Sequence, residues 1–123
     1  MYQTTTKVKI DKEIYEVRYP NVGEQLAIES MKELLSNGRY AQLAATGSKT
    51  ATQLLDFIDA VSYFTVLIPA MKEKIDLKNF ATTDPAFQKR LSKAYLKYYS
   101  DFIIPIETEI NKEIELEESE TDA

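Results

Sequence analysis

The chain has 123 residues, of which 44% are hydrophobic and 28% charged, and it contains no histidine, cysteine or tryptophan. This length fits one domain with its own hydrophobic core, while the absence of cysteine excludes disulfides and cysteine nucleophiles. Histidine is the usual general base near neutral pH and the commonest metal ligand. We therefore expect a protein that is not an enzyme and that holds no metal ion or other cofactor.

The net charge of −5 is divided unevenly along the chain. From Glu107 to the C-terminus there are seven Glu, one Asp and one Lys, a sum of −7, whereas residues 1–106 carry fourteen basic and twelve acidic side chains, a sum of +2. The N-terminus has no apolar segment of the signal-peptide type. The longest uncharged run, residues 60–71, is too short to cross a membrane. We expect no membrane partner.

Residues 7–19 are predicted to form a β-hairpin. Hydrophobic and charged side chains alternate on both sides of the polar turn Asp11-Lys12-Glu13, which is the pattern of two half-buried strands. The alternating hydrophobic residues are Val8, Ile10, Tyr15, Val17 and Tyr19. A lone hairpin is only marginally stable in water, so this one must pack on helices or pair with another chain.

Residues 21–104 are predicted to be helical. Asn21 with Glu24 matches the capping pattern of a first helix, and Ser48 can cap a long helix over about residues 50–68 after a short one at 39–45. Asp84-Pro85 places a capping carboxylate before a proline at the first helical position, which begins the last helix. We expect Pro69 to break or kink the long helix and Pro105 to interrupt the last one.

Three helical stripes of hydrophobic residues are expected to build the core. That of the first helix is Leu26, Ala27, Met31, Leu34 and Leu35, and that of the long helix is Leu54, Phe57, Val61, Phe64 and Ile68. That of the last helix is Phe87, Leu91, Ala94, Tyr95, Tyr98 and Phe102. The predicted fold class is mainly α (α+β), with an N-terminal β-hairpin followed by a bundle of four to five helices. Residues 1–106 are expected to form a single compact domain, and residues 107–123 an acidic helical extension whose end frays from Glu115.

Carboxylates are the strongest remaining candidates for catalysis or metal binding. The acidic segment at residues 107–122 lacks the spacing and the glycine of an EF-hand loop, so a solvated helix end is the favoured interpretation. Asp56 and Asp59 lie three residues apart opposite the hydrophobic stripe of their helix, and we expect both to face solvent. Neither set predicts a catalytic or metal site.

Tyrosine gives the strongest indication of function, because the chain has eight tyrosines and no tryptophan. Tyrosine is enriched at interfaces, where its ring packs and its hydroxyl finds a partner. The candidate partner-binding residues are Tyr15, Tyr19, Tyr95, Tyr98 and Tyr99. The alternative is that these rings lie in the core with their hydroxyls at the surface.

A basic stripe on the last helix is a second candidate. Lys89, Lys93 and Lys97 recur every four residues with Arg90 beside them, which is how a helix would present cations to phosphates. The alternatives are a solvated helix face or pairing with the acidic C-terminal segment. The chain shows none of the common nucleic-acid-binding motifs.

Residues 15–26, which read YEVRYPNVGEQL, lead into Ile28-Glu29-Ser30-Met31-Lys32. Together with residues 37–40, residues 64–69 and the aromatic-rich last helix, they resemble small proteins encoded among the structural genes of tailed bacteriophages, over about residues 7–105. The resemblance implies a non-enzymatic role in virion assembly, as a tail-assembly chaperone or a small neck or tail component. It implies partners among other phage structural proteins or further copies of the chain, in the host cytoplasm or the virion. The alternative function is that of a small nucleic-acid-associated regulatory protein that uses the basic stripe.

Overall fold

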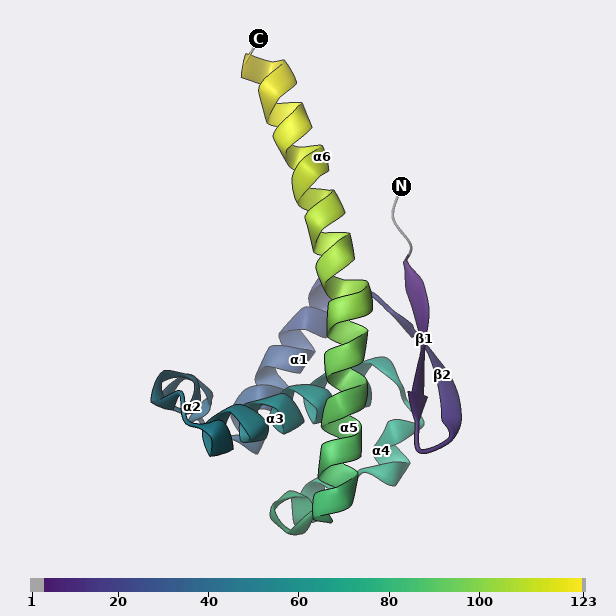
Figure 1. The fold of residues 1–123 in the computed structure, drawn as a ribbon, viewed down its shortest axis with the longest axis vertical. Coiled ribbons are helices and arrows are strands. Elements are labelled where there is room, and N and C mark those ends of the chain that lie inside the picture. Colours follow the sequence, from purple (N-terminus) through teal and green to yellow (C-terminus); the bar gives the residue numbers. More distant parts are fainter. Residues whose placement is uncertain (1–3, 123) are drawn as a thin grey trace.

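A computed structural model describes residues 4–122 and shows an N-terminal hairpin followed within that range by six α-helices (Figure 1). The strands are β1 (Thr5–Ile10) and β2 (Glu13–Arg18). The helices are α1 (Val22–Leu35), α2 (Tyr40–Thr46), α3 (Lys49–Leu67), α4 (Met71–Lys74), α5 (Pro85–Tyr98) and α6 (Ile104–Asp122). A 3₁₀ segment, η1 (Leu77–Thr82), precedes α5, and a π-helical turn, η2 (Tyr99–Ile103), follows it. The predicted class, mainly α with an N-terminal hairpin, is confirmed.

The hairpin is antiparallel and pairs Val8 with Tyr15 and Ile10 with Glu13. Asp11 and Lys12 form its two-residue loop with φ values of 47° and 73°, the left-handed conformation that a tight turn between twisted strands requires. Alternation along the strands buries one face, which carries Val8 and Ile10, and turns the lysines of β1 outward. The hairpin thus covers the core on one face only.

The core is built around α3, which lies across α5 and also packs on α1 and α2 (Figure 1). Four residues of the predicted α3 stripe are buried: Phe57, Val61, Phe64 and Ile68. The predicted stripe of α1 is partly wrong, because Leu26 and Leu34 are 66% and 69% exposed. Ile28 and Lys32 are the buried residues of α1 instead. Their face of the helix packs on α3, where the Lys32 ammonium lies 3.8 Å from the Asp59 carboxylate.

The predicted helix boundaries are set by local hydrogen bonds. The Glu24 amide donates to the Asn21 side chain over 2.8 Å, and the Asn21 amide donates back to Glu24 over 3.0 Å, which is a capping box. The Ser48 and Asp84 side chains accept from backbone amides at the starts of α3 and α5. α3 ends at Leu67, just before Pro69. Within the described residues, none of the helices combines the length and the apolar character needed to cross a membrane.

The last helix differs from the prediction at Pro105. α5, η2 and α6 form one continuous rod (Figure 1), in which the Ile104 amide donates to the Tyr99 carbonyl five residues before it. Proline has no amide hydrogen and its ring clashes with the carbonyl four residues earlier; the wider π-turn accommodates both, so the helix does not end. The expected fraying from Glu115 also differs from the structure, in which α6 is helical to Asp122, because its many Glu residues are good helix formers.

Candidate functional site: a basic groove between β1 and α5

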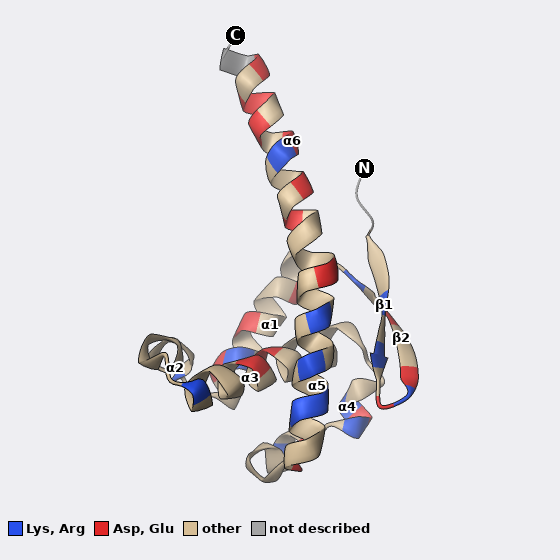
Figure 2. Ribbon diagram, viewed as in Figure 1, with Lys and Arg blue, Asp and Glu red and all other residues tan. Residues whose placement is uncertain are grey.

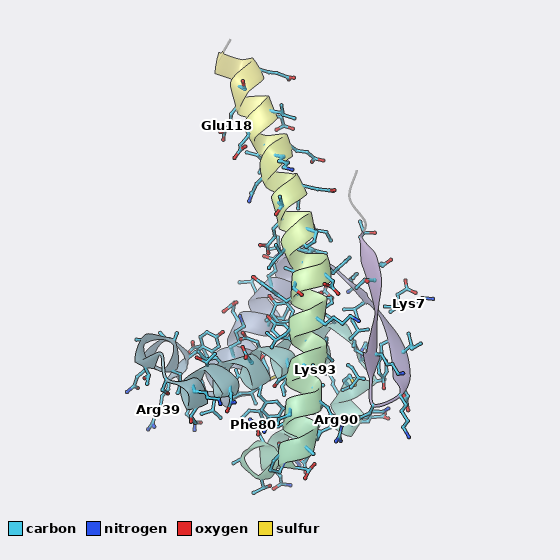
Figure 3. The ribbon with its side chains drawn as sticks, viewed as in Figure 1. Lys7, Arg39, Phe80, Arg90, Lys93 and Glu118 are labelled. Atoms are coloured by element: carbon cyan, nitrogen blue, oxygen red, sulfur yellow. The ribbon has the colours of Figure 1, made fainter. Side chains whose placement is uncertain are left out.

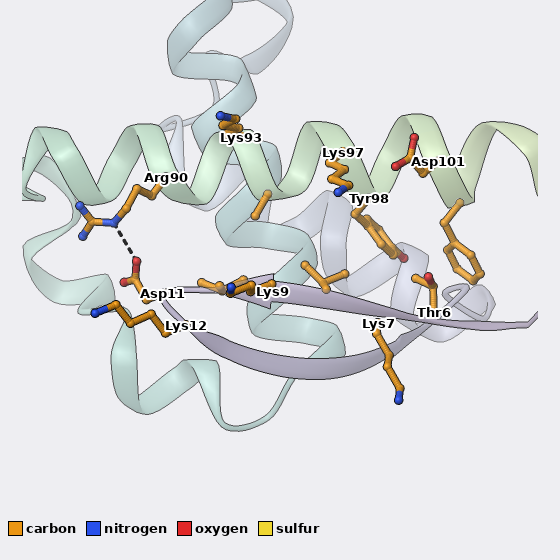
Figure 4. Close-up of a pocket in the computed structure, with 14 residues that line it drawn as sticks. Thr6, Lys7, Lys9, Asp11, Lys12, Arg90, Lys93, Lys97, Tyr98 and Asp101 are labelled. Carbon is orange, nitrogen blue, oxygen red and sulfur yellow. Dashed lines mark hydrogen bonds and ion pairs between the residues drawn. The ribbon is translucent and has the colours of Figure 1, made fainter.

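A groove of about 810 Å³ lies between β1 and α5 (Figure 4). Six basic side chains line it, Lys7, Lys9, Lys12, Arg90, Lys93 and Lys97, together with two acidic ones, Asp11 and Asp101. These charges sum to +4. The groove therefore gathers positive charge in a chain whose net charge is negative.

The floor of the groove is apolar. Val8 and Ile10 of β1, Tyr98 of α5 and Phe102 of η2 line it, and each is at most 6% exposed. The two-residue period of β1 and the helical period of α5 explain this arrangement, because each element turns apolar residues towards the core and its basic residues towards solvent. The result is an apolar strip between two basic rims, one on β1 and one on α5.

Most of the cations in the groove have no anionic partner. Arg90 Nε lies 2.7 Å from Asp11 Oδ1 and joins the two rims at the hairpin turn (Figure 4). Within residues 4–122, no ion pair forms at the five lysines, Lys7, Lys9, Lys12, Lys93 and Lys97, and all five are exposed. The five ammonium groups are available to an anionic ligand.

The outer edge of β1 borders this groove. The described sheet has two strands, so β1 pairs on one side only. Ile10 and Glu13 flank the two-residue loop, and such a flanking pair is hydrogen-bonded, with bonded pairs recurring at every second residue. The backbone N–H and C=O groups of Lys7 and Lys9 therefore point away from β2. A bound segment can use these groups as well as the side chains.

Two of the predicted partner-binding tyrosines lie in the core. Tyr95 and Tyr98 are 5% and 3% exposed, and burial raises the pKa of both phenols. The Tyr98 hydroxyl donates to the Arg18 carbonyl over 3.1 Å and thereby ties α5 to β2, while the Tyr95 ring lies 5.0 Å from that of Tyr63. The expectation that Tyr95 and Tyr98 project towards a partner is corrected: Tyr95 is a core residue, and Tyr98 contributes only to the groove floor.

The other three predicted tyrosines are half-buried and pack against the same core. The Tyr15 hydroxyl donates to Glu13 over 2.8 Å and accepts from Lys74 over 2.7 Å. The Tyr19 hydroxyl lies 3.4 Å from Glu107, and the centre of the Tyr99 ring lies 5.9 Å from that of Tyr95, with the two rings tilted by 42°. These tyrosines hold the hairpin and the C-terminal rod in place.

The basic stripe is divided by the fold. Arg90, Lys93 and Lys97 line the groove, whereas Lys89 faces a smaller hollow beside Gln53 and Asp56. The structure adds the lysines of β1, which sequence reasoning did not select as functional. Their alternation with Val8 and Ile10 was the available signal, but it does not say which helix the hairpin lies against.

A second polar cluster joins α1, α2 and α3. The expectation that Asp59 faces solvent is wrong: its side chain is 17% exposed and accepts a 2.6 Å hydrogen bond from the Tyr40 hydroxyl. Lys32 Nζ lies 3.0 Å from Glu29 and over the rings of Tyr40 and Tyr63. Burial raises the pKa of Asp59 above its usual value. Burial also raises the pKa of Tyr63, to about 12. Because these groups satisfy one another, we assign the cluster a structural role.

Among the residues that the structure describes, no three Asp or Glu side chains gather as a metal site would require. A scan against family models, a search of curated proteins and a search of solved structures each found no match. The chemistry of the groove is therefore the basis on which a function can be assigned.

Proposed function

We propose that this protein is a non-enzymatic assembly protein that binds an acidic segment of a protein partner in the groove between β1 and α5. The observation that carries the proposal is the apolar floor between two basic rims. An amphipathic segment with carboxylates on both sides of an apolar stripe matches this surface, because ion pairs at the rims orient it while its apolar side chains pack against the floor and the aliphatic stems of the lysines that line the groove.

A protein segment fits the groove better than a nucleic acid does. Single-stranded nucleic acids bind through exposed aromatic rings on which bases stack, but the aromatic residues at the groove, Tyr98 and Phe102, are 3% and 4% exposed.

The resemblance to small proteins of tailed bacteriophages supplies the setting of the proposal. It supports a role in virion assembly, as a tail-assembly chaperone or a small neck or tail component, with other phage structural proteins as partners in the host cytoplasm or the virion. A role of this kind needs a contact surface rather than a catalytic centre. The groove is a surface of that kind.

A titration tests the proposal. The probe is a fluorescent amphipathic peptide of Glu and Ile with the isoleucines at helical spacing, and a fluorescent single-stranded oligonucleotide is the comparison. We expect the peptide to bind more tightly than the oligonucleotide, and added salt to weaken binding because exposed charges are screened. The variant Lys9→Glu/Lys97→Glu places one reversed charge on each rim and is expected to bind the peptide at least ~10-fold more weakly, about the factor that 1.4 kcal/mol supplies.

The matched control is Lys49→Glu/Lys89→Glu, which makes the same change in net charge outside the groove. It is expected to bind the peptide with less than ~3-fold loss, as long-range screening predicts. Equal loss in both variants, or tighter binding of the oligonucleotide than of the peptide, would contradict the proposal.

A further inference from the structure

We infer that the acidic segment received by the groove is α6 of a second copy of this chain, so that molecules associate head to tail. The inference rests on the proposed function of the groove and names its partner. Its basis is that the chain carries both halves of a complementary pair. The groove sums to +4, and the segment from Glu107 onward sums to −7.

α6 has little to hold it against its own molecule. It extends away from the body of the protein, with the C-terminus at its tip (Figure 1), and its main contacts are with η2, the turn directly before it. Ile106 is buried at its base, but Ile114 is 46% exposed. A stripe that continues the core into solvent is thus left uncovered in the single molecule.

The exposed face of α6 has the chemistry that the groove requires. Successive residues are about 100° apart around a helix, so Glu113 and Glu118 lie on opposite sides of Ile114. Glu118 projects from the rod into solvent (Figure 3). An apolar residue between two carboxylates is the counterpart of an apolar floor between two rows of lysines. Seated in the groove, Ile114 covers the floor while the two glutamates reach the rims on β1 and α5.

The pairing has to form between molecules. The acidic rod and the basic surface of α5 and β1 lie at different places along the molecule (Figure 2). α6 is a straight continuation of α5 through η2, so it points away from its own groove. Because the two contacting surfaces differ, the interface is heterologous, and each bound copy leaves one groove and one α6 free for the next. Such association is expected to produce oligomers that grow with protein concentration and dissociate in high salt.

The test uses two full-length variants with opposite reversals. The first, Lys9→Glu/Lys97→Glu, makes the rims acidic, and the second, Glu113→Lys/Glu118→Lys, makes the docking face of α6 basic. The control for the second is Glu109→Lys/Glu115→Lys, which has the same net charge but alters two glutamates that lie on either side of the helix face away from Ile114. Sedimentation velocity at low salt gives the oligomeric state of each protein alone and of the mixtures, and circular dichroism checks that each variant is folded.

We expect the wild-type protein and the Glu109→Lys/Glu115→Lys control to associate, and each of the other two variants to be monomeric alone. A mixture of those two variants is expected to associate again, because each supplies the surface that complements the other. A wild-type protein that stays monomeric at low salt, or a mixture that stays monomeric, would overturn the inference. If the groove still binds the acidic peptide in that case, the proposed function stands without self-association; if peptide binding also fails, both are wrong.

Discussion

The C-terminal rod has two halves that differ in what supports them. α5 buries Leu91 and Tyr95 against α3 and the hairpin, whereas α6 leaves Ile114 and Leu116 46% and 65% exposed. The backbone runs through both halves as one helix, with the π-helical turn η2 between them, just before Pro105. Tertiary packing therefore stabilises α5, while local helix propensity stabilises the outer part of α6. A segment with so little packing is expected to unfold locally at a lower free energy than the packed core.

Proline substitutions give the largest expected difference between the two halves. Ser92→Pro in α5 removes a helical hydrogen bond and introduces a ring clash in the packed half, and it should lower the free energy of unfolding by about 3 kcal/mol or more. Glu115→Pro should disrupt the outer turns of α6 but change the free energy of unfolding by less than ~0.5 kcal/mol. Urea denaturation followed by tyrosine fluorescence measures both. Equal destabilisation by the two prolines would show that α6 is part of the cooperative fold.

A smaller effect is expected where the packed half of the rod meets the hairpin. Tyr98→Phe removes the hydroxyl that donates to the Arg18 carbonyl and leaves that carbonyl without this partner. We expect a loss of about 1 kcal/mol in the free energy of unfolding, again measured by urea denaturation. A change below ~0.3 kcal/mol, well under the usual value of a buried hydrogen bond, would mean that the Tyr98 hydroxyl does not help to hold the hairpin against α5.

The smallest expected effect concerns Asp59, a half-buried carboxylate of the body. Burial raises the pKa of Asp59 above its usual 3.8, so the folded state binds a proton more readily than the unfolded state. Stability from this group is therefore greatest below pH 3.8 and falls as the pH rises through the raised pKa. Between neutral pH and about pH 4, the wild-type protein should gain free energy of unfolding relative to Asp59→Asn on acidification.

Thermal denaturation of the wild-type protein and of Asp59→Asn at a series of pH values provides this comparison. A wild-type protein that loses stability relative to Asp59→Asn on acidification would reverse the assigned direction of the Asp59 pKa.

Local signals in the sequence predicted the parts of the fold that depend on neighbouring residues. Asn21 with Glu24, and Asp84 before Pro85, predicted the starts of α1 and α5 because a cap needs only residues within one turn. The buried face of α1 was not predictable in this way. Lys32 is buried because Asp59 and Tyr40, on two other helices, lie around its ammonium group. The sequence of α1 alone does not indicate those partners.

The two basic faces of the candidate site could be predicted from local sequence patterns, but their placement side by side could not. The four-residue spacing of Lys93 and Lys97 showed a basic face on the last helix, and the alternation of Lys7 and Lys9 with hydrophobic residues showed a strand with basic residues on one side. The groove exists because the hairpin packs beside α5, and that placement depends on contacts distant in sequence. The five tyrosines were selected for their residue type, and their burial depends on the same packing.

Mapping the acidic peptide onto the protein by amide chemical shifts tests the central claim most directly. The ¹⁵N-labelled protein is titrated at a salt concentration at which it is monomeric. The proposed groove predicts that amide shifts concentrate in residues 7–12 and 90–102, with little change along α1. Shifts centred on the exposed Leu26 and Leu34 of α1, with none in β1 or α5, would contradict the proposed groove. They would show that the peptide binds to an apolar face of α1 instead.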